Sequence, residues 1–196
     1  MRPDLLLASN SPRRRDLLFE AGFDFETCAP QIAERFDVDL TLRELTALNA
    51  LRKAMAVARA HPKKIVLAAD TLVAIDDRVL GKPNSVDEAV AMLQRLSGRA
   101  HEVCTSVVIS HLRRGKSTSF SEISRVRFRR LSRDEIDCYL QRIDPLDKAG
   151  AYAAQGVGGE IIENIDGSFT NVVGLPMEKT VPVLAEFGIE PNPQTN

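Results

Sequence analysis

Hydroxyl and guanidinium side chains, which suit phosphate binding, are concentrated near the start of the chain in the segment Ser9-Asn10-Ser11-Pro12-Arg13-Arg14-Arg15. The segment follows a short apolar run and should open a helix, because serine or asparagine is a good N-cap and proline suits the first helical turn. Free amides and the positive end of the helix dipole favour an anion there, and hydroxyl and guanidinium groups add charge-assisted hydrogen bonds. The alternative is a solvated helix start with surface arginines.

A second candidate is Asp70, in Ala68-Ala69-Asp70-Thr71 at the end of a predicted buried strand. Sheets of α/β proteins place ligands at the carboxyl ends of their strands, although an acid there also commonly caps a loop. Lys82 precedes Pro83, which would fix the backbone that carries the lysine. Glu34 and Lys53 have no local signal, and a surface position is the default for each.

The segment 147–156 combines charged residues with small ones and ends at Gln155-Gly156. Small residues allow a ligand to approach the backbone closely, and the amide of Gln155 offers both a donor and an acceptor to a base edge. Gly156-Val157-Gly158-Gly159 is superficially similar to a dinucleotide-binding loop. We reject that interpretation because the segment precedes a predicted strand rather than a helix.

Composition limits the class of protein. The 196 residues are 44% hydrophobic and 27% charged with a net charge of -1, which is ordinary for a soluble globular protein. No overall basic field would recruit nucleic acid or an anionic membrane, so a polyanion needs a local cluster of cations. Three dispersed cysteines favour reduced thiols in the cytoplasm, and no apolar run is long enough for a membrane span or a signal peptide.

The predicted elements alternate between strands and helices, which indicates an α/β protein with a mixed sheet in one domain over residues 1–196. Strands are expected at 5–8, 23–29, 65–69, 101–112 and 119–128, with hairpins pairing 72–75 with 78–80 and 160–165 with 169–173. Helices are expected from 11 to 21, 41 to 60, 85 to 96, 132 to 140 and 176 to 187.

Taken together, the motifs resemble the Maf family of nucleoside triphosphate pyrophosphatases. They occur in the family's order along nearly the whole chain: 8–14, 69–71, 81–83, 147–152 with 155–156, and 171–176. The resemblance implies a mixed twisted sheet flanked by helices, two lobes around a cleft, and a fold similar to inosine triphosphate pyrophosphatases. It further implies a divalent metal, Mg²⁺ or Mn²⁺, and a cytoplasmic enzyme that is often a homodimer.

The resemblance also assigns roles to positions of this sequence. Asp70 matches the acid taken as proton acceptor, and Glu34 matches the second acid of the cleft. The remaining matches are the phosphate-facing cations Arg13, Arg14, Lys53 and Lys82, and the hydroxyls of Ser9 and Ser11. Glu34 and Asp70 are the expected metal ligands, because magnesium prefers carboxylate oxygens.

Three positions place the chain in the branch of the family that acts on dTTP and UTP rather than on 7-methyl-GTP. These are Arg13 after Ser-Pro, Thr71 after the catalytic acid, and Gln155 before the final glycine of its motif. Ala69 and Ala153-Ala154 depart from the common residues without removing a functional group.

The expected reaction is in-line attack of water on the α-phosphorus, giving the monophosphate and pyrophosphate as a house-cleaning activity. Two alternatives stay open at this point: a pyrophosphatase that prefers purine nucleotides or 7-methyl-GTP, and a non-enzymatic regulator of septum formation or cell division.

Overall fold

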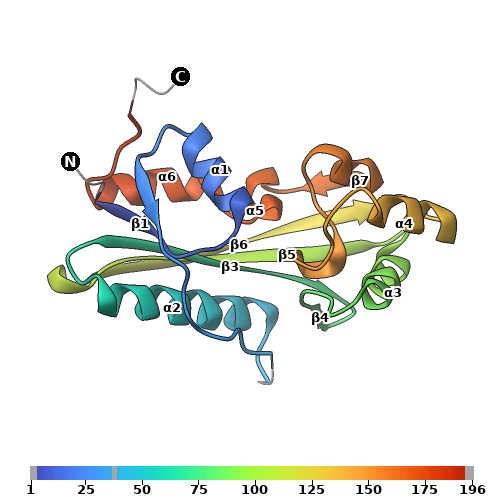
Figure 1. Cartoon of the computed structure of the whole chain (residues 1–196), viewed down its shortest axis with the longest axis horizontal. Helices are drawn as coiled ribbons and strands as arrows, with labels where there is room; N and C mark the ends of the chain where they lie inside the picture. Colours follow the sequence, from blue (N-terminus) through green and yellow to red (C-terminus); the bar gives the residue numbers. More distant parts are fainter. Residues whose placement is uncertain (1–3, 37–38, 193–196) are drawn as a thin grey trace.

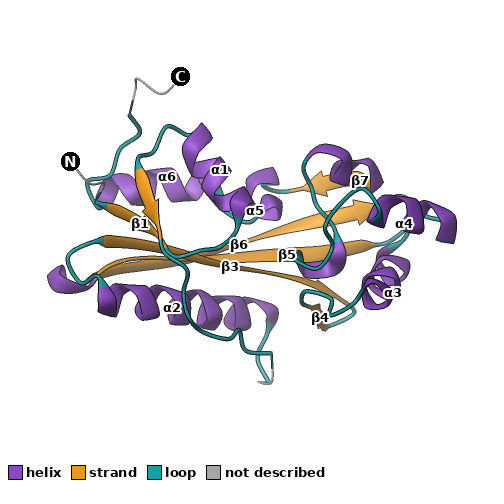
Figure 2. Ribbon diagram, viewed as in Figure 1, coloured by secondary structure: helices purple, strands orange, loops and turns teal. Residues whose placement is uncertain are grey.

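The computed structural model describes residues 4–36 and 39–192. Within these ranges a seven-stranded mixed sheet has the order β2-β1-β3-β5-β6-β7, with β4 beside β3 (Figures 1 and 2). The strands are β1 (Leu5–Leu7), β2 (Phe25–Thr27), β3 (Ile65–Ile75), β4 (Arg78–Leu80), β5 (Ala100–His111), β6 (Lys116–Phe128) and β7 (Ile162–Asp166). The helices are α1 (Pro12–Glu20), α2 (Leu42–Ala60), α3 (Val86–Leu96), α4 (Arg133–Leu140), α5 (Phe169–Val173) and α6 (Met177–Glu186), with 3-10 turns η1 (Leu112–Arg114), η2 (Ala149–Ala151) and η3 (Gly156–Ile161).

Helices cover both faces of this sheet. β1 runs parallel to β2 and β3, whereas β3, β5, β6 and β7 pair antiparallel in turn. α2 lies along one face and α1, α5 and α6 lie on the other, while α3 and α4 sit beside the far end (Figure 1). The described part of the chain has no helix that is both long and apolar enough to cross a membrane.

The start of α2 follows directly from its sequence. The Thr41 hydroxyl accepts a hydrogen bond from the Glu44 amide, and the Glu44 carboxylate accepts one from the Thr41 amide. This capping box satisfies two amides that the helix leaves unpaired. Alanines on the buried side of α2 then pack on the apolar residues of β1, β3 and β5, which brings the helix close to the sheet. Lys53 lies in this buried stretch.

An interruption along one edge of β3 creates the space for a site. β1 pairs with residues 65–67 of β3, and β4 pairs with residues 73–75 on the same edge. The opposite edge is continuously paired with β5 from Val66 to Ala74. Residues 68–72 therefore have no strand partner on the first edge, and Asp70 and Thr71 lie within this gap.

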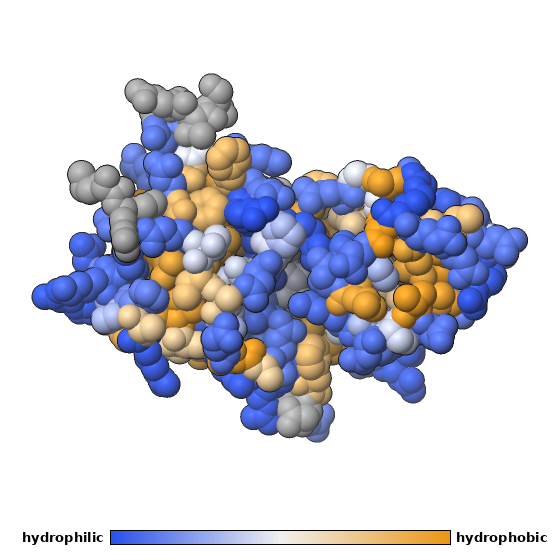
Figure 3. All heavy atoms as spheres, viewed as in Figure 1, coloured by the Kyte–Doolittle hydropathy of each residue, from blue (hydrophilic) through white to orange (hydrophobic). Residues whose placement is uncertain are grey.

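Two separate clusters of buried side chains lie on the two sides of the gap. One joins β1, α1 and α6 to the near part of the sheet, and the other joins α3 and α4 to the far parts of β3, β5 and β6. The surface is hollowed between these two halves, and hydrophilic residues surround the hollow (Figure 3). The predictions of a mixed sheet flanked by helices and of two lobes around a cleft are confirmed.

The strand predicted at 169–173 is wrong, because these residues form α5. The Ser168 hydroxyl accepts a hydrogen bond from the Asn171 amide and caps the helix, and Gly174, at φ 124°, ends it. β7 pairs with β6 instead of forming a hairpin with 169–173.

The strands predicted at 65–69 and 72–75 are one continuous strand, so Asp70 lies inside β3 and not at its end. The hairpin of β3 and β4 is confirmed, with positive φ at Asp76 and Asp77.

His101 gives the fold a predictable response to acid. Burial lowers the pKa of His101 to about 4, and its Nε2 lies 2.9 Å from the Tyr152 hydroxyl. The unfolded state, with a pKa of about 6.5, binds more protons between these two values, so stability is lost as the pH falls from about 6.5 towards 4. We expect a loss on the order of 3 kcal/mol from this residue. Urea unfolding at pH 7 and pH 4.5 tests it, because His101→Gln should show a smaller loss; equal losses in both proteins would contradict the assignment.

Candidate active site

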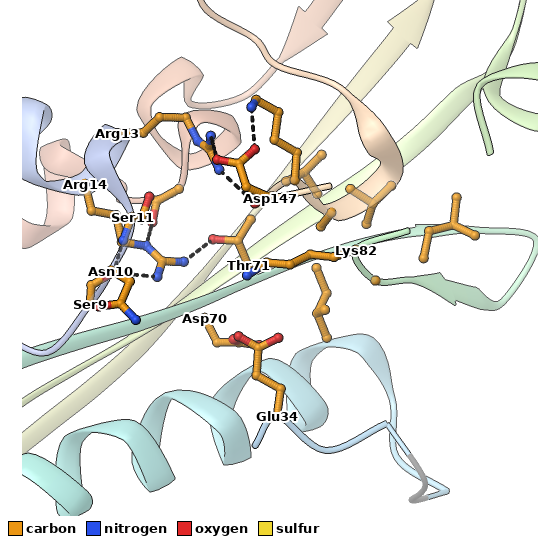
Figure 4. A pocket seen from close by; sticks show the side chains of 18 of the residues that line it. Ser9, Asn10, Ser11, Arg13, Arg14, Glu34, Asp70, Thr71, Lys82 and Asp147 are labelled. Carbon is orange, nitrogen blue, oxygen red and sulfur yellow. Dashed lines mark hydrogen bonds and ion pairs between the residues drawn. The ribbon is translucent and has the colours of Figure 1, made fainter. Parts of the chain in front are cut away.

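The gap in the edge of β3 opens into a cleft of ≈ 890 Å³, a volume typical of ligand sites. Side chains from both lobes and from the segment before α2 line it (Figure 4). Nine of the ten predicted site residues lie on its wall: Ser9, Ser11, Arg13, Arg14, Glu34, Lys53, Asp70, Thr71 and Lys82. Residues from five separate parts of the chain therefore meet in one cavity.

The loop between β1 and α1 forms the first wall of the cleft. The Ser9 hydroxyl accepts a hydrogen bond from the Ser11 amide at 3.1 Å, which tightens the turn into the helix. Ser11 is the N-cap residue, but its side chain makes no capping bond. The Ser11 hydroxyl and the amides that follow Pro12 in the first turn of α1 are therefore available to an anion.

Arg14 is buried, and three protein acceptors fix its guanidinium. Nε donates to the Gly174 carbonyl at 2.7 Å, and the two terminal nitrogens donate to Ser9 Oγ at 3.3 Å and Thr71 Oγ1 at 2.9 Å. Burial lowers the pKa of Arg14, while the charges of Asp70 and Glu34 oppose that shift. Arg14 is thus a fixed cation on the cleft wall and not a solvated surface arginine.

Arg13 is held from the opposite side of the cleft. Its Nη1 lies 3.1 Å from Asp147 Oδ2, and its Nη2 donates to the Asp147 carbonyl at 3.3 Å. Lys148 also pairs with the Asp147 carboxylate. This half-exposed ion pair joins α1 to the segment before η2 across the cleft (Figure 4). A phosphate group in the cleft would compete with the Asp147 carboxylate for Arg13 and Lys148, because both cations form charge-assisted hydrogen bonds to phosphate oxygens.

Asp70, Lys53 and Glu34 form the charged centre of the cleft floor. Lys53 Nζ, from α2, lies 2.6 Å from both Asp70 Oδ1 and Glu34 Oε1. The Asp70 side chain is 2% exposed and the Lys53 side chain 10%. Strand alternation explains the contact: Asp70 lies on the α2 face of β3, whereas Thr71 lies on the face covered by α1 and α5.

The pKa values of Asp70 and Glu34 are shifted in opposite directions. Burial raises the pKa of Asp70 above its ordinary value even though Lys53 pulls it down, and the charge of Glu34 adds to the rise. At Glu34, burial raises the pKa less than the fields of Lys53, Lys82 and Arg14 lower it, so the net shift is downward. The deeper carboxylate is therefore the better proton acceptor of the two.

Lys82 extends over the cleft from the loop that follows β4. It is exposed, it lowers the pKa of Glu34 by its charge, and within residues 4–36 and 39–192 it makes no ion pair. Pro83 behind it is buried, so the backbone that carries the lysine is anchored. Among the described residues, Lys82 is thus an unpaired cation that faces the floor of the cleft.

Gln155 is the one predicted site residue that the structure does not bring to the cleft wall. It is half-buried, and among the described residues its neighbours Ala153 and Ala154 line the cavity instead. Tyr139 holds the ends of this segment: its hydroxyl accepts from the Ala153 amide and donates to the Gly158 carbonyl, both at 3.2 Å. The turn that carries Gln155 is therefore fixed beside the cleft.

The two carboxylates fit a divalent cation. Asp70 Oδ2 is buried and has no hydrogen-bond partner among the described residues, which leaves one oxygen for a ligand. Within the same residues no group of three or more His, Cys, Asp or Glu side chains could hold an ion alone. Magnesium is commonly bound by one or two carboxylates together with waters and substrate phosphates. Glu34 and Asp70 match that pattern.

Sequence reasoning gave no role to two residues that organise the cleft. Asp147 lies in a recognised motif, but its pairing with Arg13 joins positions 134 apart in sequence. Thr105 hydrogen-bonds to Thr71 across β3 and β5, and it is fully buried. The only sequence signal for Thr105 is the polar pair Thr105-Ser106 inside the apolar strand 103–109.

Proteins of known sequence are similar to this chain over nearly its whole length. A dTTP/UTP pyrophosphatase of Bacillus pumilus is 45% identical over 187 residues, covering 95% of this chain and 98% of that protein. One from Symbiobacterium thermophilum is also 45% identical, covering 94% of each chain.

Solved structures agree at the level of the fold. The Ham1 protein of Staphylococcus aureus superimposes with a TM-score of 0.52 at 15% identity, covering 93% of this chain and 96% of that one. The Ham1 protein of Coxiella burnetii gives 0.53 at 12% identity, covering 93% and 98%. The family model described as Maf-like protein matches residues 4–187, and the chain therefore belongs to the Maf-like protein family.

Proposed function

We propose that this protein hydrolyses nucleoside triphosphates, with dTTP and UTP preferred, to the monophosphate and pyrophosphate. The observation that carries the proposal is the buried Asp70–Lys53–Glu34 cluster on the floor of the cleft whose wall bears Arg13, Arg14 and Lys82. A proton acceptor and a set of phosphate-binding cations face one cavity. The pyrophosphatase names of the 45%-identical relatives support the same reaction.

The cations and the first turn of α1 account for binding of the triphosphate. A bound triphosphate carries roughly four negative charges, which a chain of net charge -1 must meet locally. Arg14 is already oriented by three acceptors, so little conformational entropy is lost when it binds phosphate. The Arg13 guanidinium and the Lys82 ammonium group add positive charge to the cleft, and they stabilise the negative charge that develops on the leaving pyrophosphate.

Asp70 is the proposed acceptor of the proton from the attacking water. Water adds to the α-phosphorus, the bond from that phosphorus to the bridging oxygen breaks, and pyrophosphate leaves on the opposite side. A divalent cation bound by Glu34 and Asp70 would lower the pKa of water and offset phosphate charge. Lys53 holds Asp70 Oδ1 at 2.6 Å and so keeps the carboxylate oriented towards the reacting centre.

A nucleotide panel tests the proposal. We expect pyrophosphate release from dTTP and UTP with Mg²⁺ or Mn²⁺, and much slower release from CTP, GTP and 7-methyl-GTP. Loss of metal to a chelator should stop the reaction. No release from any nucleotide with either metal would refute the enzymatic proposal and favour a regulatory protein, for which a captured protein partner would then be required.

The choice of base gives a prediction at Gln155. Gln155 lies beside the cavity and not on its wall, and we propose that the base extends past Ala153 and Ala154 so that the Gln155 amide reads the pyrimidine; a carboxylate there would suit the positively charged 7-methylguanine. Gln155→Glu should therefore shift the ratio of kcat/KM for dTTP over 7-methyl-GTP by about 10-fold or more towards the latter, a size typical of one changed hydrogen bond. Glu160→Gln, on the exposed surface nearby, serves as the control. An unchanged ratio in Gln155→Glu would remove this role.

A further inference from the structure

Four residues from four elements form one hydrogen-bonded line that ends at the cleft. Arg14 Nη2 lies 2.9 Å from Thr71 Oγ1, and Thr71 Oγ1 lies 2.9 Å from Thr105 Oγ1. Thr105 Oγ1 in turn donates to the Asn171 carbonyl at 2.9 Å. We call Arg14–Thr71–Thr105–Asn171 the hydroxyl chain; its first contact is visible in Figure 4.

The direction of every proton in the hydroxyl chain is determined by its two ends. A carbonyl oxygen only accepts and a guanidinium only donates, while each threonine hydroxyl has a single proton. Thr105 donates its hydroxyl hydrogen bond to the Asn171 carbonyl, so Thr71 must be the donor to Thr105. The lone pairs of Thr71 are then left to accept from Arg14.

The fold places these groups so that the arrangement has little freedom. Thr71 and Thr105 are directly opposite each other in the β3–β5 register, on the sheet face that α5 covers. Thr105 and Asn171 are fully buried, and Asn171 is tied by its side-chain amide to the Val103 carbonyl and the Ser124 hydroxyl. Water does not compete at this buried end, so the proton order set there is transmitted to Thr71.

We propose that Thr105 is a positioning residue: by accepting the hydrogen bond that the Thr71 hydroxyl donates, it leaves only lone pairs of Thr71 facing Arg14, which fixes the Arg14 guanidinium for the triphosphate. The inference rests on the proposed function for its substrate. It also gives Thr71 a specific task, because its proton is committed to Thr105 and is not available to a nucleotide. The three acceptors leave one N–H on each terminal nitrogen of Arg14 unused, and we expect these to bind phosphate oxygens.

Thr105→Val tests the proposal because it removes the hydroxyl and keeps the shape of the side chain. We expect kcat/KM for dTTP, and the affinity for inorganic triphosphate, to fall about 10- to 50-fold, the size expected when a hydrogen bond that orients a charged group is lost. Thr105→Ser keeps the hydroxyl and should stay within about 3-fold of the parent. Thr105→Ala carries the same expectation as Thr105→Val if the latter does not fold.

The double variant separates positioning from general stabilisation. Since Thr105 acts through Thr71, Thr105→Val should cost little further activity in a Thr71→Val background. Thr180→Val is the matched control: Thr180 is equally buried, but it lies in α6 away from the cleft lining, and its hydroxyl donates to the Pro176 carbonyl. It should leave kcat/KM unchanged.

Two results would overturn the proposal: parent kcat/KM and triphosphate affinity in Thr105→Val, or losses that multiply in the double variant. If the parent protein hydrolyses no nucleotide, the proposed function fails on its own. Calorimetric binding of inorganic triphosphate to the same variants then still tests the hydroxyl chain.

Discussion

Asp70→Asn is expected to lower kcat for dTTP by about 10³-fold, the range that a general base contributes, while the protein stays folded. The amide oxygen can still accept the hydrogen bond that Lys53 gives to Oδ1. The amide cannot take up a proton, and it is a poor ligand for a divalent cation. Steady-state release of pyrophosphate measures the loss, and urea unfolding should show a change within about 1 kcal/mol.

Asp147→Asn is the matched control for this variant, because Asp147 is a carboxylate on the same cleft that binds Arg13. Its amide keeps a hydrogen bond to Arg13, so we expect at most about a 10-fold change. If Asp70→Asn retained activity close to the parent, or if the two variants lost the same amount, Asp70 would not be the proton acceptor.

Lys53→Met is expected to reduce both stability and activity. It removes the only cation that contacts Asp70 within the described residues and leaves two carboxylates facing each other across the cleft floor. Removing one partner of a buried ion pair commonly costs about 3 kcal/mol or more, and urea unfolding measures this cost. We also expect kcat to fall about 10²-fold, because the Asp70 carboxylate loses its orientation and takes up a proton more readily.

Lys53→Met in an Asp70→Asn background separates the contribution of the Lys53 charge from that of its packed methylene groups. In Asp70→Asn, which has no buried charge at that position, Lys53→Met should cost at least about 1 kcal/mol less than in the parent. Equal costs in the two backgrounds would mean that Lys53 contributes through its methylene groups and not through its charge.

The sequence predicts most elements of this fold because their local signals agree with their packing. Three helix starts carry local signals, Ser11-Pro12, Thr41-Leu42-Arg43-Glu44 and Ser132-Arg133-Asp134-Glu135, and the three helices begin close to where these signals predict. Thr41 with Glu44 and Ser132 with Glu135 both form capping boxes. The prediction fails at 169–173, where Phe169, Val172 and Val173 are residue types common in strands, although their spacing is that of one helical face. These residues form a helix because Ser168 caps it and because the edge of β6 is already paired with β7.

The sequence predicts which residues form the candidate site, but it does not predict most of the contacts that hold them there. Nine of the ten predicted residues line the cleft, although Glu34 and Lys53 had no local signal and came only from the family resemblance. The position of Asp70 is explained by an interruption in strand pairing and not by a strand end. Contacts such as Arg14 to Gly174 join positions 160 apart, and no local pattern encodes them.

Hydrolysis of dTTP in water enriched in ¹⁸O tests most directly the claim that this cleft cleaves between the α- and β-phosphates. The account predicts one labelled oxygen in dTMP and none in the pyrophosphate, as read by mass spectrometry of both products. Label in pyrophosphate would place the attack on the β-phosphorus. Formation of dTDP and labelled orthophosphate would place it on the γ-phosphorus, and either result would contradict the proposed placement of the substrate over Asp70.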